Sequence, residues 1–335
     1  MAKKKLTMQT IADELGVTKV SVSKALNGRP GISDKLRDEI VRKAEEMGYK
    51  KLRNNLTEMP GKFAFIVPKR FFLDNTSIYS TIYYYLNKKM QRAGFELSLY
   101  VINAAEEEGI SIPPSVSSYA YNGIFVAGEF MKPYMEKLAK LHIATVAIDF
   151  YSPEFRFDFA VPDYFYLGFH NTNYLIATGH KRIGFVGDIR HLNATMDKYY
   201  GYRKALESKG LPVNPDWTLV NNDPLTGAYH NNYKLPDPLP DAFVCHCDLA
   251  AYYLLQRLLS EGHAVPDDVS LIGFDNAGIC TISSPQISSV DIHLSEYAGK
   301  AYDLMMQRLK AMDKPPQRVY IPAKMIIRET CAPRG

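Results

Sequence analysis

The feature that most constrains the fold of this chain is the regular alternation of short apolar runs with helix-like segments after Lys62. Runs such as residues 63–67 and 123–127 contain no polar side chain. Such runs are typical of strands that are buried on both faces of a sheet. Between them, apolar residues recur every three or four positions, which is the period of a helix. Strands that alternate with helices predict parallel sheets covered by helices on both faces.

This alternation occurs in two successive series, and each series predicts one α/β lobe. The first has strands at 63–67, 96–101, 123–127 and 144–148, with helices at 77–93 and 134–141. The second begins after Asp163, with strands at 182–186, 217–220, 242–245 and 269–274 and helices that end at Gly179, Lys209 and Gly262. Ligands of parallel α/β sheets bind beyond the carboxyl ends of the strands. Two lobes therefore predict a ligand cleft between them.

The first 49 residues show a different pattern, which predicts three short helices. Thr7 can cap the first helix and Gly16 can end it, because glycine adopts the left-handed C-cap conformation at low cost. Thr18 can cap a second helix from Lys19 to Leu26, and Ser33 can cap a third. Two short helices joined by a tight glycine turn, with a third packed behind them, indicate a helix-turn-helix unit.

Positive charge is concentrated in the same part of the chain. The first 62 residues contain 14 Lys and Arg against 8 Asp and Glu, whereas the remainder contains 26 against 28. A basic module on a nearly neutral body indicates a polyanionic partner. The second helix of such a unit enters the major groove, and its outward residues here are polar or cationic: Lys19, Ser21, Ser23 and Lys24. A three-helix bundle that binds protein is the alternative interpretation.

The segment 8–27, MQTIADELGVTKVSVSKALN, resembles the start of regulators of the lactose-repressor (LacI/GalR) family, and the likeness continues to Tyr49. The resemblance implies a repressor that binds operator DNA, with Lys19 and Val20 where the family reads bases. Lys24 replaces a more common arginine, so a point charge stands in place of a bidentate fork. Ser21 replaces a usual threonine. The candidate DNA contacts are Thr7, Thr18, Lys19, Val20, Ser21, Ser23, Lys24, Asn27 and Leu56.

Leu56 belongs to the linker at 50–61, where similar proteins have a hinge helix that folds on operator DNA. A leucine from each subunit then enters the minor groove as a wedge, and Leu56 is the first candidate, with Leu52 the second. The linker departs from the family pattern because it lacks the usual proline and Ala-Arg pair and is two residues shorter. A flexible basic tether that contacts only phosphates is therefore the alternative.

Motifs of the large domain extend the resemblance over nearly the whole chain. Segments 179–187, 201–206 and 271–276 are similar to family motifs, which implies a periplasmic-binding-protein-like, two-lobed α/β domain. The predicted division is a helix-turn-helix domain at 1–49, a hinge at 50–61, and an effector-binding and dimerisation domain at 62–335. Its lobe 1 spans about 62–161 and 291–321, and its lobe 2 about 162–290 and 322–331.

Two carboxylates stand at strand ends that face the predicted cleft. Asp149 follows the strand at 144–148, and Asp275 follows the strand at 269–274. Each carboxylate can accept hydrogen bonds from ligand hydroxyls, so a sugar or sugar derivative is the favoured effector. The resemblance adds Tyr79, Lys198 in place of a common arginine, and Cys247 in place of a common asparagine. The alternatives are structural: helix caps for the two aspartates, core packing for Tyr79, and plain surface for Lys198.

Several function classes are disfavoured by the sequence. Cys245-His246-Cys247 is too closely spaced for a structural zinc site, so we expect free thiols, no metal and no cofactor. No G-x-x-x-x-G-K-[ST] loop or G-x-S-x-G elbow is present, and we expect no catalytic residues and no enzyme. No apolar run reaches the ~18 residues of a membrane span, no signal peptide is recognisable, and few cysteines suit a reducing compartment. We therefore expect a cytoplasmic protein that does not bind membranes.

By the same resemblance, the aromatic run at 83–85 lies near a subunit interface, which implies a homodimer that matches a pseudo-palindromic operator. Two alternatives to the regulator stay open at this point. One is a carbohydrate-binding protein built on the same lobes. The other is a carbohydrate-active enzyme that uses Asp149 and Asp275 as a carboxylate pair.

Overall fold

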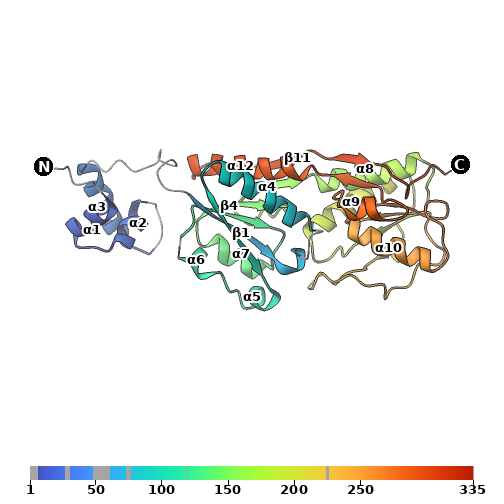
Figure 1. The fold of residues 1–335 in the computed structure, drawn as a ribbon, viewed down its shortest axis with the longest axis horizontal. Coiled ribbons are helices and arrows are strands. Elements are labelled where there is room, and N and C mark those ends of the chain that lie inside the picture. The colour runs from blue at the N-terminus through green and yellow to red at the C-terminus, as the bar shows by residue number, and fades with distance from the viewer. Residues whose placement is uncertain are drawn as a thin grey trace. The chain divides into compact units, whose positions relative to one another are not determined.

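A computed structural model describes residues 7–26, 31–47, 61–72, 77–118, 120–223 and 226–334. The chain divides into two compact units, Met1–Pro60 and Gly61–Gly335. Figure 1 shows both units, and each is described here by itself. In the described ranges, no helix is long and apolar enough to cross a membrane.

The described part of the first unit consists of α1 (Met8–Leu15), α2 (Lys19–Leu26) and α3 (Asp34–Glu46). Its core contains the buried side chains of Ile11, Val22 and Ile40, one from each helix. The predicted caps of α1 are confirmed. Thr7 accepts a hydrogen bond from the Thr10 backbone N–H, and Gly16 has a left-handed φ of 63°. These caps fix the boundaries of α1 by local interactions alone.

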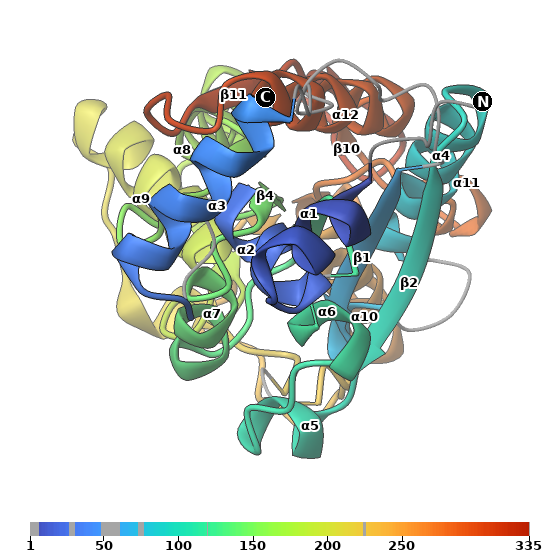
Figure 2. The same cartoon turned by 90° about the vertical axis from the view of Figure 1, so that its left-hand side faces the viewer.

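The larger unit contains a fully parallel sheet whose strand order is β11-β5-β4-β3-β1-β2. Helices α4 and α12 lie on one face of it, and α6 and α7 lie on the other (Figures 1 and 2). Together these elements form lobe 1, with β1 (Lys62–Pro68), β2 (Glu96–Ile102), β3 (Gly123–Ala127), β4 (Ala144–Ile148), β5 (Asp158–Pro162), β11 (Arg318–Ile321), η1 (Lys69–Phe71), α4 (Ile78–Arg92), α5 (Ala104–Glu108), α6 (Pro114–Ser117), α7 (Lys132–Ala139) and α12 (Leu294–Lys310).

A second parallel sheet, of order β7-β6-β8-β9, forms lobe 2 with its own helices. Its elements are β6 (Ile183–Val186), β7 (Thr218–Leu219), β8 (Ala242–Cys245), β9 (Ser270–Ile272), α8 (Tyr164–Ala177), α9 (Asn193–Ser208), α10 (Asp248–Ser260), α11 (Ile279–Ile282) and η2 (Pro215–Trp217). The chain passes from one lobe to the other after β5, β10 and β11. The two predicted α/β lobes are thus present.

Some elements were not predicted from the sequence. The strands β10 (Ser289–Asp291) and β12 (Lys324–Ile326) pair antiparallel beside the lobes, so the expectation of parallel sheets alone was incomplete. Strands β5 and β11 and helix α12 were also missed. Strands this short give little periodic signal, and their pairing with distant partners decides whether they form.

The connection from β7 to β8 is unusual for a parallel pair. The two strands lie on either side of β6, and such a crossover usually contains a helix. In the described residues between 220 and 241, the connection contains no helix. Long irregular connections inside compact domains are uncommon and are often functional.

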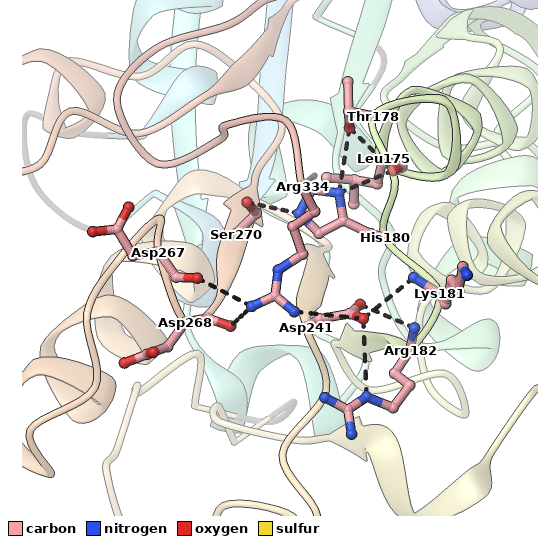
Figure 3. A network of polar contacts seen from close by, with 10 residues as sticks. All are labelled: Leu175, Thr178, His180, Lys181, Arg182, Asp241, Asp267, Asp268, Ser270 and Arg334. Carbon is pink, nitrogen blue, oxygen red and sulfur yellow. Dashed lines mark hydrogen bonds and ion pairs between the residues drawn. The ribbon is translucent and has the colours of Figure 1, made fainter.

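A polar network at the amino ends of the lobe 2 strands holds the C-terminal segment in place (Figure 3). The Arg334 guanidinium lies 3.7 Å from the Asp241 carboxylate, which also accepts a 2.9 Å hydrogen bond from the Arg182 backbone N–H. The buried His180 ring lies 2.9 Å from the Ser270 hydroxyl, and burial lowers its pKa. This network lies at the opposite end of the sheet from the strand termini that carry the predicted ligand contacts.

Candidate functional site

A cavity of about 200 Å³ lies between the two lobes, at the carboxyl ends of their strands. All five residues predicted to contact an effector line it: Tyr79, Asp149, Lys198, Cys247 and Asp275. Tyr79 and Asp149 come from lobe 1, and the other three come from lobe 2. The structure therefore brings together side chains that are up to 196 positions apart in the sequence, because parallel strands end at a common edge.

The backbone is unusual at both strand ends that carry aspartate. Asp149 directly follows β4 with a φ of 76°, and Asp275 follows β9 with a φ of 100°. Non-glycine residues rarely adopt positive φ, and such residues cluster at ligand sites, where surrounding contacts hold them. The alternative that these aspartates are helix caps does not apply, because neither is the N-cap residue of a helix in the described part of the chain: the first helix after Asp275, α11, has Gly278 as its N-cap.

Asp149 is already hydrogen-bonded within the protein. Tyr79 donates its hydroxyl to Asp149 Oδ2 at 2.5 Å, and Tyr164 donates its hydroxyl to Oδ1. Burial raises the pKa of Asp149, whereas Lys198 and the two tyrosine hydroxyls oppose that rise. Each carboxylate oxygen has a second lone pair, so Asp149 can orient the two tyrosines and still accept a ligand hydroxyl.

Asp275 differs from Asp149 because its carboxylate accepts no hydrogen bond from any described residue. Its side chain is half-buried at the cavity wall. Burial raises the pKa of Asp275 to about 6, and the nearby Asp149 charge adds to the effect, while Lys198 and His246 oppose it. A carboxylate held without a donor at a cavity wall is ready to accept a hydrogen bond from a ligand.

Lys198 is 5% exposed, so the alternative of a plain surface lysine is wrong. Its ammonium donates a 2.8 Å hydrogen bond to the His246 carbonyl and lies 4.2 Å from the centre of the Tyr164 ring. It also lies 4.7 Å from the centre of the Phe274 ring. The buried cation is thus placed among aromatic faces, which attract cations.

The helix that carries Lys198 packs very closely on α8. A Cβ atom at Gly168 would lie 2.2 Å from the Lys198 carbonyl oxygen, and one at Gly201 would lie 2.0 Å from the Phe165 carbonyl oxygen. Only glycine fits at such distances, so α8 and α9 are expected to move as one body with lobe 2.

Cys247 caps α10 and lies at the cavity. Its sulfur accepts a 3.4 Å hydrogen bond from the Ala250 backbone N–H and lies 3.0 Å from the Tyr229 hydroxyl. Burial raises the pKa of the Cys247 thiol, and burial lowers the pKa of the adjacent His246 to about 4. The four cysteines are free, and no group of three or more potential metal ligands occurs within the described part of the chain.

Glu129, Asn222 and Tyr229 are among the cavity residues that the sequence reasoning missed. Glu129 follows β3 closely, and Asn222 follows β7, so the rule that identified Asp149 and Asp275 would have found both if applied to every strand. Tyr229 had no such signal, because it reaches the cavity through the irregular connection between β7 and β8.

Glu129 also joins the lobes across the cavity. Its carboxylate accepts hydrogen bonds from the Asn193 backbone N–H at 3.0 Å and from the Asn193 side chain at 2.5 Å. Asn193 is the first residue of α9, whose own N-cap residue, Leu192, makes no side-chain cap. A carboxylate from lobe 1 therefore caps a lobe 2 helix. Burial raises the pKa of Glu129, and the Asn193 hydrogen bonds and Arg70 oppose this.

The predicted DNA-reading residues lie mostly on α2. Lys19 and Val20 are exposed, and the Val20 side chain is 63% exposed although it is apolar. Ser21, Ser23 and Lys24 are half-buried. Thr18 acts as a cap, since it accepts a 3.1 Å hydrogen bond from the Ser21 backbone N–H, and its hydroxyl lies 2.9 Å from that of Ser21. Asn27 and Leu56 lie outside the described residues.

Comparisons with known proteins extend these observations. A family model for a periplasmic binding protein-like domain matches residues 172–331. The repressor PurR of Histophilus somni is 23% identical over 97% of this chain and 98% of its own length. NtdR of Bacillus subtilis, a regulator of the NTD biosynthesis operon, is 24% identical over 97% of this chain and 99% of its own length.

Solved structures share the fold. A complex of the transcriptional regulator CelR with cellobiose has a TM-score of 0.69 at 21% identity and covers 98% of this chain and 100% of that one. A LacI-type regulator from Bacillus cereus subsp. cytotoxis has a TM-score of 0.71 at 21% identity and covers 83% of this chain and 100% of that one. The named relatives are regulators of transcription, not enzymes. Over nearly its whole length the chain is similar to transcriptional regulators of the LacI family, and its residues 172–331 match a periplasmic binding protein-like domain.

Proposed function

We propose that this protein is a cytoplasmic transcriptional repressor that binds operator DNA through α2 and senses a neutral sugar or sugar derivative in the cavity between its lobes. The observation that carries the proposal is the meeting of Asp149, Lys198 and Asp275 at one cavity in a chain whose first unit is a helix-turn-helix. Effector binding and operator binding are then coupled reciprocally.

The chemistry of the cavity favours a hydroxylated ligand. Asp275 offers acceptors that no described residue occupies, and Lys198 offers ammonium protons beyond the one used by the His246 carbonyl. A ring of hydroxyl groups can donate to the first and accept from the second. Among the structural relatives, CelR was solved with cellobiose and a regulator from Enterococcus faecium with ribose.

The DNA-binding proposal rests on the exposed face of α2. An apolar side chain that is 63% exposed at the start of this helix, Val20, is suited to contact with a thymine methyl group. Lys19 beside it is suited to a guanine edge or a phosphate. We propose domain limits of 1–49 for DNA reading, 50–61 for a hinge in which Leu56 contacts the minor groove, and 62–335 for effector binding.

We also propose a homodimer formed through lobe 1. Within the aromatic run of α4, Tyr84 is 58% exposed and Tyr85 is 37% exposed. Tyr83 instead packs edge-on against Phe65, with ring centres 5.3 Å apart. Two adjacent exposed tyrosines supply the amphipathic surface that protein interfaces favour. Two copies related by a two-fold axis would match a pseudo-palindromic operator.

The enzyme alternative is less well supported by the geometry. Both oxygens of Asp149 accept tyrosine hydroxyls, and the two aspartates belong to different lobes. Glycoside hydrolysis needs its two carboxyl groups at a fixed separation around the scissile bond, and an Asp149 oxygen that already accepts a tyrosine hydroxyl is a weaker nucleophile. The arrangement suits recognition of a ligand better than cleavage of one.

The test uses the full chain in two steps. Cycles of selection from random double-stranded DNA should enrich a pseudo-palindromic sequence. Fluorescence anisotropy with that sequence should then change when cellobiose, ribose or another sugar from a panel is added, and Asp275→Ala should lose the response but keep DNA binding. Absence of any enriched sequence would refute the DNA-reading proposal. A response that survives in Asp275→Ala would refute the assignment of the cavity.

A further inference from the structure

One wall of the cavity is built by a short hairpin in the irregular connection between β7 and β8. Asn222 and Tyr229 form an isolated antiparallel bridge. Backbone hydrogen bonds from His230 N–H to the Asn221 carbonyl, at 2.9 Å, and from Asp223 N–H to the Ala228 carbonyl, at 2.8 Å, hold the pair together. The bridge places both side chains at the cavity, so a connection that usually carries a helix here supplies ligand-facing groups.

Asn222 is a polar side chain with an unmet hydrogen-bonding requirement. It is only 7% exposed, and its Oδ1 is fully buried without a hydrogen-bond partner. Buried polar atoms in native proteins nearly always have partners, so this one needs an explanation. A half turn about χ2 exchanges Oδ1 and Nδ2, so the carboxamide can present either a donor or an acceptor to the cavity.

Tyr229 places a rigid ring and a hydroxyl beside Asn222. Its ring stacks on Tyr253, with centres 5.3 Å apart and planes at 21°. Its hydroxyl lies 3.0 Å from the Cys247 sulfur and 3.4 Å from His246 Nε2, and both of these are weak or poorly placed partners. The Tyr229 hydroxyl is therefore also able to exchange a neighbour for a ligand group.

We propose that Asn222 is an effector-contacting and specificity-determining residue, which binds a vicinal pair of hydroxyl groups through both ends of its carboxamide. A vicinal diol offers a donor and an acceptor at the spacing that a carboxamide matches. Tyr229 forms the adjacent wall and fixes the position of Asn222 through the bridge. This role rests on the proposed sugar-sensing function, and it adds the Asn222 carboxamide to Asp275 as a second side chain that binds the ligand.

The first test needs no ligand. In the full chain without effector, Asn222→Leu should raise Tm by a few degrees, because it removes a polar group that is buried without a partner. Asn222→Ala is a second variant, which removes the same carboxamide without introducing the branched side chain of leucine. The matched control is Asn221→Leu at the neighbouring position, whose Oδ1 is also buried without a partner but whose Nδ2 donates a 2.9 Å hydrogen bond to the Ala250 carbonyl, and which does not line the cavity. That variant should lower Tm. If both Asn222 variants lower Tm as Asn221→Leu does, Asn222 is structural and the proposal is overturned.

The second test measures binding by calorimetry, with cellobiose, ribose, glucose, adenine and guanine as probes. A sugar that binds the wild type should bind Asn222→Leu about ten-fold more weakly, and its deoxy analogue lacking one of the two hydroxyls should show no difference between the proteins. Equal affinity of wild type and Asn222→Leu for the sugar overturns the proposal, and so does binding of nucleobases alone. If no probe binds the wild type, the sugar-sensing function fails, and the Tm comparison still decides the role of Asn222.

Discussion

Replacing Glu129 by alanine is expected to weaken the contact between the two lobes of Gly61–Gly335. The substitution removes both hydrogen bonds to Asn193, at 3.0 Å and 2.5 Å. It leaves α9 without a cap, because Leu192 supplies none and the first turn of the helix has no acidic residue. The carboxylate also lies at the positive end of the helix dipole.

The size of the effect follows from these contacts. Loss of an N-cap typically costs ~1 kcal/mol, and hydrogen bonds to a charged acceptor contribute about 1.5–3 kcal/mol. Because Glu129 and Asn193 are only half-buried, water replaces part of the lost bonding, and we expect a net loss of about 1–2 kcal/mol. For a unit of this size the loss corresponds to a Tm decrease of roughly 3–6 °C. Glu129→Gln keeps one acceptor and should lose about half as much.

The assay combines thermal unfolding with hydrogen exchange at the start of α9. The matched control is Glu154→Ala, which removes an exposed carboxylate 2.8 Å from Lys132. Exposed ion pairs contribute about 0–1 kcal/mol, so this variant should leave Tm nearly unchanged. Equal Tm values for the Glu129 and Glu154 variants, with unaltered amide protection at 193–197, would show that Glu129 does not hold the lobes together.

Three further predictions concern charge and DNA contact. Burial raises the pKa of Asp275 to about 6, from ~3.9 in an unfolded chain, so the stability that its protonated form gives the folded state is complete below about pH 4 and is lost as pH rises through 6. The Tm of Asp275→Asn should therefore exceed that of wild type by an amount that grows from pH 4 to 7, and a constant difference in Tm would contradict this. Lys198→Met should move that window to higher pH, since Lys198 lowers the pKa of Asp275; an unshifted window in the same Tm series would exclude the interaction. Val20→Ala should weaken binding to the selected operator by ~1 kcal/mol or more without changing Tm, because the side chain is 63% exposed; anisotropy titrations that show wild-type affinity would remove Val20 from the DNA contacts.

The sequence determined those features that depend on neighbouring residues. Thr7, Gly16 and Thr18 mark the boundaries of α1 and α2 because capping is a local interaction. The apolar runs gave the strands β1, β3, β4 and β8, since strands buried on both faces need no alternation. The positions of Asp149 and Asp275 at strand ends followed from the same runs.

Only the tertiary structure decided how distant segments combine. The pairing of β10 with β12 joins residues 33 to 37 positions apart, and no local period encodes such a partner. The burial of Lys198 depends on the close packing of α9 on α8 at Gly168 and Gly201. The hydrogen bonds that the Asp149 carboxylate accepts depend on Tyr79 and Tyr164, which reach it from other parts of the chain. The position of Asn222 after a strand could have been read from the sequence, but only the folded chain showed that its Oδ1 is buried without a partner. Sequence patterns report what one segment can form by itself, whereas hydrogen-bond satisfaction and burial depend on every segment that packs around a group.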